Sequence, residues 1–331
     1  MRTKIIAEIG VNHDGSIEKA IQLVDAAVAA GADIVKFQTF TADLLATPSA
    51  PKAKYQERED VENQIELLKR LELTTEDHRQ IIEHCRRKHV EFLSTGFDQD
   101  NVDFLVSLGL RRLKVPSGEI TNLPYLRHIG SKGLPVILST GMANLGEVEA
   151  AIDALQSVGM SRQNLTVLHC TSEYPAPMAE INLQAMETIR IAFGIAVGYS
   201  DHTLGSEVAL AAVALGAVVI EKHLTLDRTS PGPDHSASLE PSEFAGMVRA
   251  IRNIEQAIGD GLKKPTDSEL RNISVVRRLL VASIPIQAGE VFSAENVAAK
   301  RPGTGISPMM WDKIIGRPAP RDYETDELIE W

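Results

Sequence analysis

Short runs of apolar and β-branched residues recur along this chain and predict eight β-strands. Their sequences are IIAEIGV, IVKFQTF, VEFLSTGF, RLKVPSGE, VILSTGM, LTVLHCT, AVGYSDHT and VVIEKHLT, which begin at residues 5, 34, 90, 112, 136, 165, 196 and 218. The runs are hydrophobic almost without interruption, a pattern typical of parallel strands that helices cover from outside. We therefore expect a parallel sheet with both faces buried.

The segments between these runs show helical periodicity. Residues 16–32 place Ile17, Ala20, Ile21, Val24 and Val28 on one face, and Ser16 is the predicted N-cap. Residues 145–159 place Val148, Ile152 and Leu155 in the same way. Eight strand–helix units predict an α/β fold, a (β/α)₈ TIM barrel. An open doubly wound sheet is the alternative, but no G-x-G-x-x-G follows the first strand.

Two departures from this rhythm divide the chain. Residues 41–74 form a long interval before the helix that leads to the third strand, and we expect either a substrate loop or a structural flap there. After Ile258 the pattern turns polar. We predict a barrel domain over residues 1–258, a linker over 259–274 and a small C-terminal domain over 275–331.

Composition narrows the classes of partner. The 331 residues carry a formal net charge of −11, which argues against nucleic acid as the main partner. The two cysteines, Cys85 and Cys170, are too few for a disulfide framework or a Cys-rich zinc site, and buried thiols in a reducing cytoplasm are expected. We find neither a signal peptide nor an apolar run long enough to span a membrane.

Every predicted strand ends in polar residues. Because active sites of such barrels lie at the carboxyl ends of the strands, this pattern predicts a polar cup. Side chains two apart share a face of a strand, so each of three pairs can point into the same cavity. The strand-end residues are Glu8, Lys36, Gln38, Ser94, Thr95, Lys114, Ser117, Glu119, Ser139, Thr140, His169, Ser200, His202, Glu221 and His223, and the pairs are Lys36 with Gln38, Ser200 with His202 and Glu221 with His223.

His202 and His223 end two adjacent strands, 21 residues apart. Two imidazole ligands leave open coordination positions on a divalent metal, which suits a catalytic Lewis acid. Two hydrogen-bonded core histidines are the structural alternative. Lys36 and Lys114, with nearby serine hydroxyls, suggest an anion site. Salt-bridged lysines and a Schiff-base lysine remain alternatives for them. Lys222 should point away from the cup.

Nine motifs, in order along the chain, resemble the sialic-acid synthase family. They are AEIGVNHDG, VKFQTF, KVPSGE, LSTGM, HCTSEYP, GYSDHT, EKH, PGPDHSAS and KRPGTG, and the C-terminal part resembles the antifreeze-like (SAF) domain. The resemblance implies condensation of phosphoenolpyruvate (PEP) with an N-acetylmannosamine-type sugar. It also implies a divalent metal, commonly manganese, with magnesium or cobalt as alternatives. The implied products are a nine-carbon 2-keto sugar acid and phosphate.

The same resemblance implies roles for individual residues. The metal ligands would be His202 and His223. The PEP-binding residues would be Lys36, Lys114, Ser117, Ser139 and Ser200, and the sugar-binding residues Glu8, Gln38, Tyr174, Asp234 and Arg301. The catalytic groups would be Glu8, Lys114, Glu119 and Glu221. Arg301 would reach the barrel of the partner subunit, which implies a domain-swapped homodimer.

The motifs also favour one acceptor sugar. They look most like the subgroup that makes N,N′-diacetyllegionaminate from 2,4-diacetamido-2,4,6-trideoxymannose. The alternative is N-acetylneuraminate made from N-acetylmannosamine, but such synthases often carry an asparagine where Thr171 and Ser172 stand here. Gly96 also departs from the usual STPF motif. A Schiff-base aldolase acting on pyruvate and a sugar-binding protein without catalysis are the competing hypotheses from other classes.

Overall fold

The chain forms two compact units, Met1–Gly259 and Asp260–Trp331. The computed structural model describes residues 2–47, 63–301 and 303–331. Each unit has a hydrophobic core of its own, the second one built around Leu280, Ile286 and Phe292. The units are therefore described separately.

Eight parallel strands form the centre of the first unit. Their order in the sheet is β3-β2-β1-β8-β7-β6-β5-β4, so the first strand pairs with the last. The two ends of this order, β3 and β4, are in contact, so the sheet closes into a ring. This confirms the predicted α/β barrel and excludes an open doubly wound sheet. The strands are β1 (Lys4–Gly10), β2 (Ile34–Thr39), β3 (Glu91–Gly96), β4 (Leu113–Val115), β5 (Val136–Ser139), β6 (Leu165–Cys170), β7 (Ala196–Asp201) and β8 (Val219–His223).

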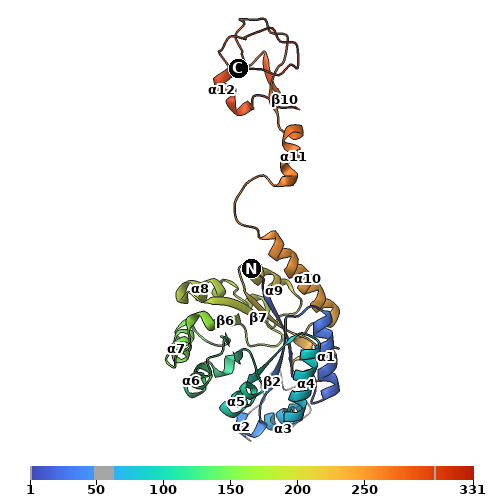
Figure 1. The fold of residues 1–331 in the computed structure, drawn as a ribbon, viewed down its shortest axis with the longest axis vertical. Helices are drawn as coiled ribbons and strands as arrows, with labels where there is room; N and C mark the ends of the chain where they lie inside the picture. The colour runs from blue at the N-terminus through green and yellow to red at the C-terminus, as the bar shows by residue number, and fades with distance from the viewer. Residues whose placement is uncertain (1, 48–62, 302) are drawn as a thin grey trace. The chain divides into compact units, whose positions relative to one another are not determined.

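Helices cover the outside of the ring (Figure 1). The N-cap predicted at Ser16 is confirmed, since its side chain accepts a hydrogen bond from the backbone N–H of Lys19. The helices are α1 (Ile17–Ala29), α2 (Ala42–Leu45), α3 (Gln64–Leu71), α4 (Thr75–Arg87), α5 (Gln99–Ser107), α6 (Leu123–Ser131), α7 (Leu145–Gln156), α8 (Gln184–Phe193), α9 (Glu207–Ala214) and α10 (Pro241–Ala257).

The register of the parallel strands places the strand ends level with one another. Glu8 is opposite Lys36 of β2 on one side and opposite His223 of β8 on the other. Ser200 of β7 is opposite Glu221 of β8. A bulge between Glu8 and Gly10 then shifts the register at the end of β1, as often happens beside active sites.

The long interval after β2 contains short helices. Leu67 and Leu71 of α3 bury against Val11 and Phe40, which makes a small core of its own at the carboxyl end of the barrel. Residues 48–62, which belong to the expected substrate loop or flap, lie outside the described residues.

The second unit pairs two antiparallel strands, β9 (Leu279–Ala282) and β10 (Val297–Lys300). It also contains α11 (Asp267–Val276) and α12 (Trp311–Ile314). The predicted linker over residues 259–274 is therefore helical in its second half. A reciprocal capping box between Thr266 and Glu269 starts that helix, which a reading of the segment as merely polar overlooks.

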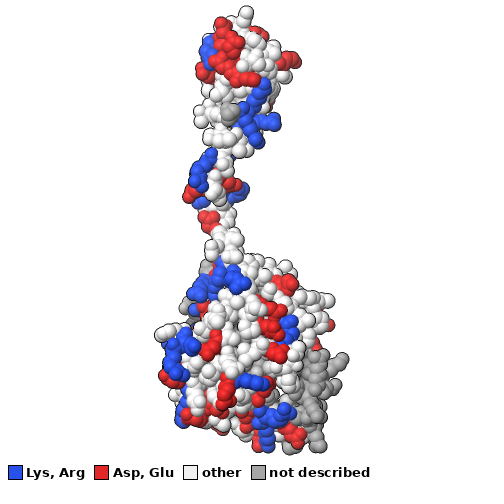
Figure 2. Space-filling view, turned by 90° about the vertical axis from the view of Figure 1, so that its right-hand side faces the viewer, with Lys and Arg blue, Asp and Glu red and all other residues white. Residues whose placement is uncertain are grey.

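Charge is distributed in small groups on the face of the first unit that Figure 2 shows, with acidic and basic side chains interspersed. None of the helices among the described residues combines the length and the apolar character that crossing a bilayer requires.

Gly198 of β7 allows β8 and β6 to approach β7 closely. A Cβ there would press on the backbone oxygen of Val219 and lie 2.6 Å from Leu168 Cδ2. We expect Gly198→Ala to lower the free energy of unfolding by about 1–3 kcal/mol, as overpacking does. Gly246→Ala in α10, where a Cβ meets only Arg249 Nη2 at 3.9 Å, is the control and should be neutral or stabilising. Urea denaturation measures both, and a neutral Gly198→Ala contradicts this packing.

Candidate active site

Four charged side chains meet at the carboxyl end of the barrel, and all are buried. Lys36 Nζ forms an ion pair with Glu8 and lies 3.7 Å from Glu221 Oε2. Lys114 Nζ donates to Glu221 Oε1 at 3.1 Å. The strand-end residues of β1, β2, β4 and β8 therefore meet in one cluster, as the sequence pattern predicts.

Burial and charge oppose each other in this cluster. Burial raises the pKa of Glu8 to about 7, although Lys36 acts in the opposite direction. Burial also acts to raise the pKa of Glu221, but the charges of Lys114 and Lys36 outweigh it and lower this pKa to about 2. Near pH 7 Glu221 is ionised but Glu8 only in part, so the two carboxylates do not fully balance the two lysines. The cup therefore suits an anion.

Three predicted serines lie around this cluster. Ser200 Oγ donates to Glu221 Oε1 at 2.9 Å. Ser139 is buried and its hydroxyl has no hydrogen-bond partner among the described residues. Ser117 Oγ accepts from the backbone N–H of Gly141 at 2.9 Å and lies 3.3 Å from Cys170 Sγ. Ser200 thus contacts the charged centre. Ser139 lies on the inner face of β5, because it follows by two residues Ile137, which pairs with Lys114. Ser117 lies beside Cys170, a neighbour that the sequence did not suggest.

The two histidines lie side by side, with ring centres 5.6 Å apart. An imidazole ring centre lies about 3.2 Å from a metal that it binds, so two rings sharing one ion are at most about 6.4 Å apart. The pair meets this limit. His202 Nδ1–H donates to the Thr171 carbonyl at 2.7 Å, so Nε2 carries the lone pair that could coordinate a metal, and Ser200 Oγ lies 3.4 Å from it. His223 Nδ1 is buried without a hydrogen-bond partner.

The electrostatics of the pair also suit metal ligands. Burial lowers the pKa of His202 to about 4. Burial, and then the neighbouring charge of His202, lowers the pKa of His223 well below its ordinary value. Both rings are therefore neutral near pH 7, the form that binds a cation. Among the described residues no group of three or more His, Cys, Asp or Glu is arranged to hold a metal, so the two imidazoles would leave positions for water or substrate.

Predicted sugar-binding residues converge at Gly10. A Cβ at this glycine would lie 3.1 Å from Glu8 Oε1, 3.3 Å from Asp234 Oδ2 and 3.4 Å from Gln38 Nε2. The bare backbone therefore leaves a space among three polar side chains. The sequence gives no role to Gly10, because its φ of 56°, in the left-handed region that favours glycine, is visible only in the structure.

Tyr174 and Asp234 connect this side of the cup to the histidines. The Tyr174 ring lies 4.2 Å from the His202 ring and 5.7 Å from the His223 ring, measured between centres. Asp234 Oδ2 is 3.8 Å from His223 Nδ1, too far for a hydrogen bond. Burial raises the pKa of Asp234 to about 6.

Several buried polar atoms of the cup have no hydrogen-bond partner among the described residues. Native proteins pair nearly all such atoms, with protein, water or ligand. Their gathering at one place therefore indicates a binding site. They are Glu8 Oε1, Ser139 Oγ, Glu221 Oε2 and His223 Nδ1.

Two predicted site residues are not joined to this cluster by the contacts of the first unit. Glu119 ends the short helix η2 (Ser117–Glu119), is half-buried and accepts a hydrogen bond from Asn122 Nδ2 at 2.6 Å. Arg301 is exposed in the second unit, directly after β10. Their predicted roles remain predictions.

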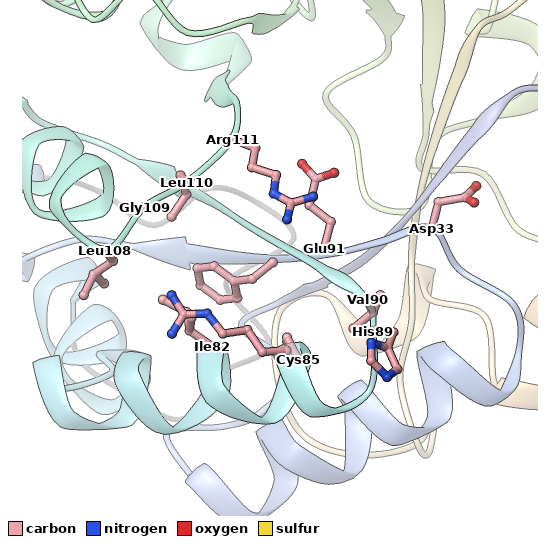
Figure 3. Close-up of a pocket in the computed structure, with 12 residues that line it drawn as sticks. Asp33, Ile82, Cys85, His89, Val90, Glu91, Leu108, Gly109, Leu110 and Arg111 are labelled. Atoms are coloured by element: carbon pink, nitrogen blue, oxygen red, sulfur yellow. The ribbon is translucent and has the colours of Figure 1, made fainter.

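A second hollow, of 570 Å³, lies at the opposite end of the barrel, at the amino end of β3 (Figure 3). Ile82 and Cys85 of α4 form one side, and Arg111 and Glu91 lie across from them. Its carboxylates are already paired, since Glu91 accepts from Arg112 and Asp33 accepts from Arg252. The cup is the better candidate because it retains unpaired buried groups at the end where such barrels carry out chemistry.

The neutral histidines predict a pH dependence of stability. Between pH 6.5, the ordinary pKa of histidine, and the pKa of about 4 for His202, the unfolded chain binds more protons than the folded one. The contribution of neutral His202 to the free energy of unfolding is therefore fully present above pH 6.5, and it is lost as the pH falls towards 4. In His202→Asn, we expect the loss between pH 7.5 and 5.0 to be about 2 kcal/mol smaller than in wild type. Urea denaturation with a chelator measures this difference, and equal losses contradict a neutral His202.

Comparison with known proteins places the chain in a family. The model of the NeuB family matches residues 23–263, and the model of the SAF domain matches residues 277–331. The chain is similar to the N,N′-diacetyllegionaminic acid synthase of Campylobacter jejuni, with 51% identity covering 99% of each chain. It is also similar to the synthase of the same name from Legionella pneumophila, with 48% identity covering 99% of this chain and 93% of the other.

A solved structure agrees with these sequence matches. The N-acetylneuraminic acid (sialic acid) synthetase of Leptospira borgpetersenii is 34% identical, with a TM-score of 0.72, and the match covers 82% of this chain and 90% of that one. The family that the sequence motifs predict is confirmed, because the family model spans most of the chain. The chain belongs to the NeuB family and carries a SAF domain after its barrel.

Proposed function

We propose that this protein condenses PEP with 2,4-diacetamido-2,4,6-trideoxymannose and water, giving N,N′-diacetyllegionaminate and phosphate. The observation that carries the proposal is the 51% identity, over 99% of both chains, with a synthase named for that product. N-acetylneuraminate formation from N-acetylmannosamine is the alternative. It is favoured by the likeness to the sialic acid synthetase, which is weaker at 34% identity.

We assign the PEP site to the two buried lysines and their serine neighbours. Lys36 and Lys114 supply the positive charge that a phosphorylated carboxylate requires. Ser139, whose hydroxyl is unpaired among the described residues, and Ser200 offer donors within the same cavity, and Ser117 offers one beside it. PEP would replace Glu8 and Glu221 as the partner of the lysines.

We assign a divalent metal to His202 and His223, with manganese expected and magnesium or cobalt as alternatives. The spacing and the neutral state of the rings support this assignment. When bound, the metal would act as a Lewis acid towards the aldehyde oxygen of the open-chain sugar. The chain's own part is to keep both imidazoles unprotonated.

The remaining steps follow from the chemistry of PEP. Its C3 attacks the aldehyde carbon, the C=O π bond opens as the new C–C bond forms, and the aldehyde oxygen takes up a proton to become a hydroxyl, while positive charge develops at C2. Water adds at C2, and the C–O bond to phosphate then breaks, which restores the keto group. Glu8 and Glu221 lie where carboxylates could stabilise this charge and accept the proton of the water, while Gln38 and Asp234 would orient the sugar.

One observation also fits a Schiff-base aldolase. Burial lowers the pKa of Lys114, which an imine-forming lysine needs. PEP carries its own nucleophilic carbon, so the proposed reaction needs no imine. Borohydride trapping of pyruvate on Lys114 distinguishes the two.

We further propose three segments and a dimer. The catalytic barrel would span residues 1–258, a linker residues 259–274 and the SAF domain residues 275–331. Arg301 of the SAF domain would bind the acetamido group of the sugar in the partner's barrel, which requires a domain-swapped homodimer. A cytoplasmic location fits two cysteines that are both free thiols.

The reaction itself is tested by offering PEP and manganese with each sugar in turn. We expect the diacetamido sugar to be converted with release of phosphate, and N-acetylmannosamine to be converted much more slowly. His202→Ala should abolish turnover, and a chelator should do so reversibly. Mass spectrometry identifies the products. Preferred conversion of N-acetylmannosamine contradicts the assigned sugar, and full activity in excess chelator contradicts the metal.

The role of Arg301 is tested by complementation. We expect Arg301→Ala and His202→Ala each to be inactive alone. Coexpressed in equal amounts, they should recover about a quarter of wild-type activity, because half of the dimers are mixed and each holds one complete site. If Arg301 acted in its own subunit, no mixed dimer would hold a complete site, so an inactive mixture contradicts the swap.

A further inference from the structure

A charged network lies on the outer face of the two strands whose inner faces carry the histidines. Side chains alternate along β8, so Lys222 points away from Glu221 and His223. The alternation of the strand predicts this direction. Lys222 is nevertheless fully buried, as are Asp201 and Thr203, the residues on either side of His202. We call Asp201, Thr203 and Lys222 the strand-end clasp.

Four hydrogen bonds hold the clasp together. Asp201 Oδ1 accepts from the backbone N–H of Thr203 at 2.9 Å and from its hydroxyl at 2.7 Å. Lys222 Nζ donates to Asp201 Oδ2 at 3.0 Å and to the Thr203 carbonyl at 2.5 Å. Both carboxylate oxygens are thus used, and Lys222 joins the turn around His202 to the neighbouring strand.

His202 needs such support because the sheet ends before it. β7 ends at Asp201, which pairs with Lys222, so the backbone ladder stops one residue short of the histidine. His223 is the last residue of β8 and remains paired with Glu8. Beyond the ladder, His202 is held by its carbonyl, which accepts from Ala176 N–H, by its ring, which donates to Thr171, and by the clasp.

Stability alone does not account for the clasp. A buried ion pair is often no more stabilising than well-packed apolar side chains of similar volume, because both charges lose their hydration. What such an ion pair can do is fix the relative positions of the two segments that carry its charges. Here the geometry is the separation of two adjacent strand ends, and each strand carries one histidine directly beside a clasp residue.

We propose that the strand-end clasp positions His202 relative to His223 and thereby sets the affinity of the site for its metal. The three residues touch neither substrate nor metal, so they are positioning residues. This inference rests on the proposed metal site.

The test uses the full-length chain and Mn²⁺ alone, with the dissociation constant measured by calorimetry or electron paramagnetic resonance. The double variant Asp201→Asn with Lys222→Met removes both charges and keeps the volume. We expect it to fold and to bind Mn²⁺ about 10- to 100-fold more weakly, the range seen when residues that orient metal ligands are changed. Urea denaturation in chelator shows how far its stability changes.

Two further variants separate position from packing. Thr203→Val removes the hydroxyl bond to Asp201 without changing the shape of the side chain, and it should also weaken Mn²⁺ binding. Thr203→Ser retains the hydroxyl and should bind Mn²⁺ as wild type does. Glu91→Gln is the control, because it removes an ion pair with Arg112 at the other end of the barrel. It should lower stability without changing the Mn²⁺ affinity.

The outcomes distinguish the two proposals. If the double variant folds and its dissociation constant for Mn²⁺ is within about twofold of the wild-type value, the proposed role of the clasp is wrong. If the double variant does not fold, equal affinities of Thr203→Val and Thr203→Ser overturn it instead. If wild type binds no divalent metal at all, the metal site and the clasp both fall.

Discussion

Two buried carboxylates and two buried lysines hold one another at the centre of the barrel. Removing an isolated charge from water costs several kcal/mol, so Glu8, Lys36, Lys114 and Glu221 can be buried only in mutual contact. This contact aims the side chains into the cup before any ligand arrives. A phosphorylated acid can then enter by exchange of partners with lysines already in place, which is what pre-organised catalysis requires.

The strand pattern predicts most of this arrangement because parallel strands leave little freedom at their ends. Once Lys36 with Gln38 and Glu221 with His223 are assigned to one face of each strand, the barrel must bring them together. The histidine pair follows in the same way. The bulge at Gly10 does not follow, because it depends on a shift of register within β1 that the residue types leave open.

Other features could not be predicted because they arise between segments distant in sequence or from competing local bonds. The Thr171 carbonyl fixes the tautomer of His202, yet a carbonyl leaves no mark on a residue pattern. Glu119 is held by Asn122 three residues later, a local bond that competes with a place in the cup. Lys222 was correctly expected to face outward, but outward means buried wherever a helix covers the strand.

The two faces of β7 and β8 therefore divide the work at their carboxyl ends. Inward, Ser200 and Glu221 belong to a site whose unpaired atoms await a ligand. Outward, Asp201 and Lys222 have used their bonding capacity on each other and on Thr203. A buried polar group lowers the free energy of the protein when it finds a hydrogen-bond partner. The unpaired groups of the site therefore stay unpaired only if the surrounding backbone cannot move to pair them. A saturated network directly behind the open one supplies that rigidity.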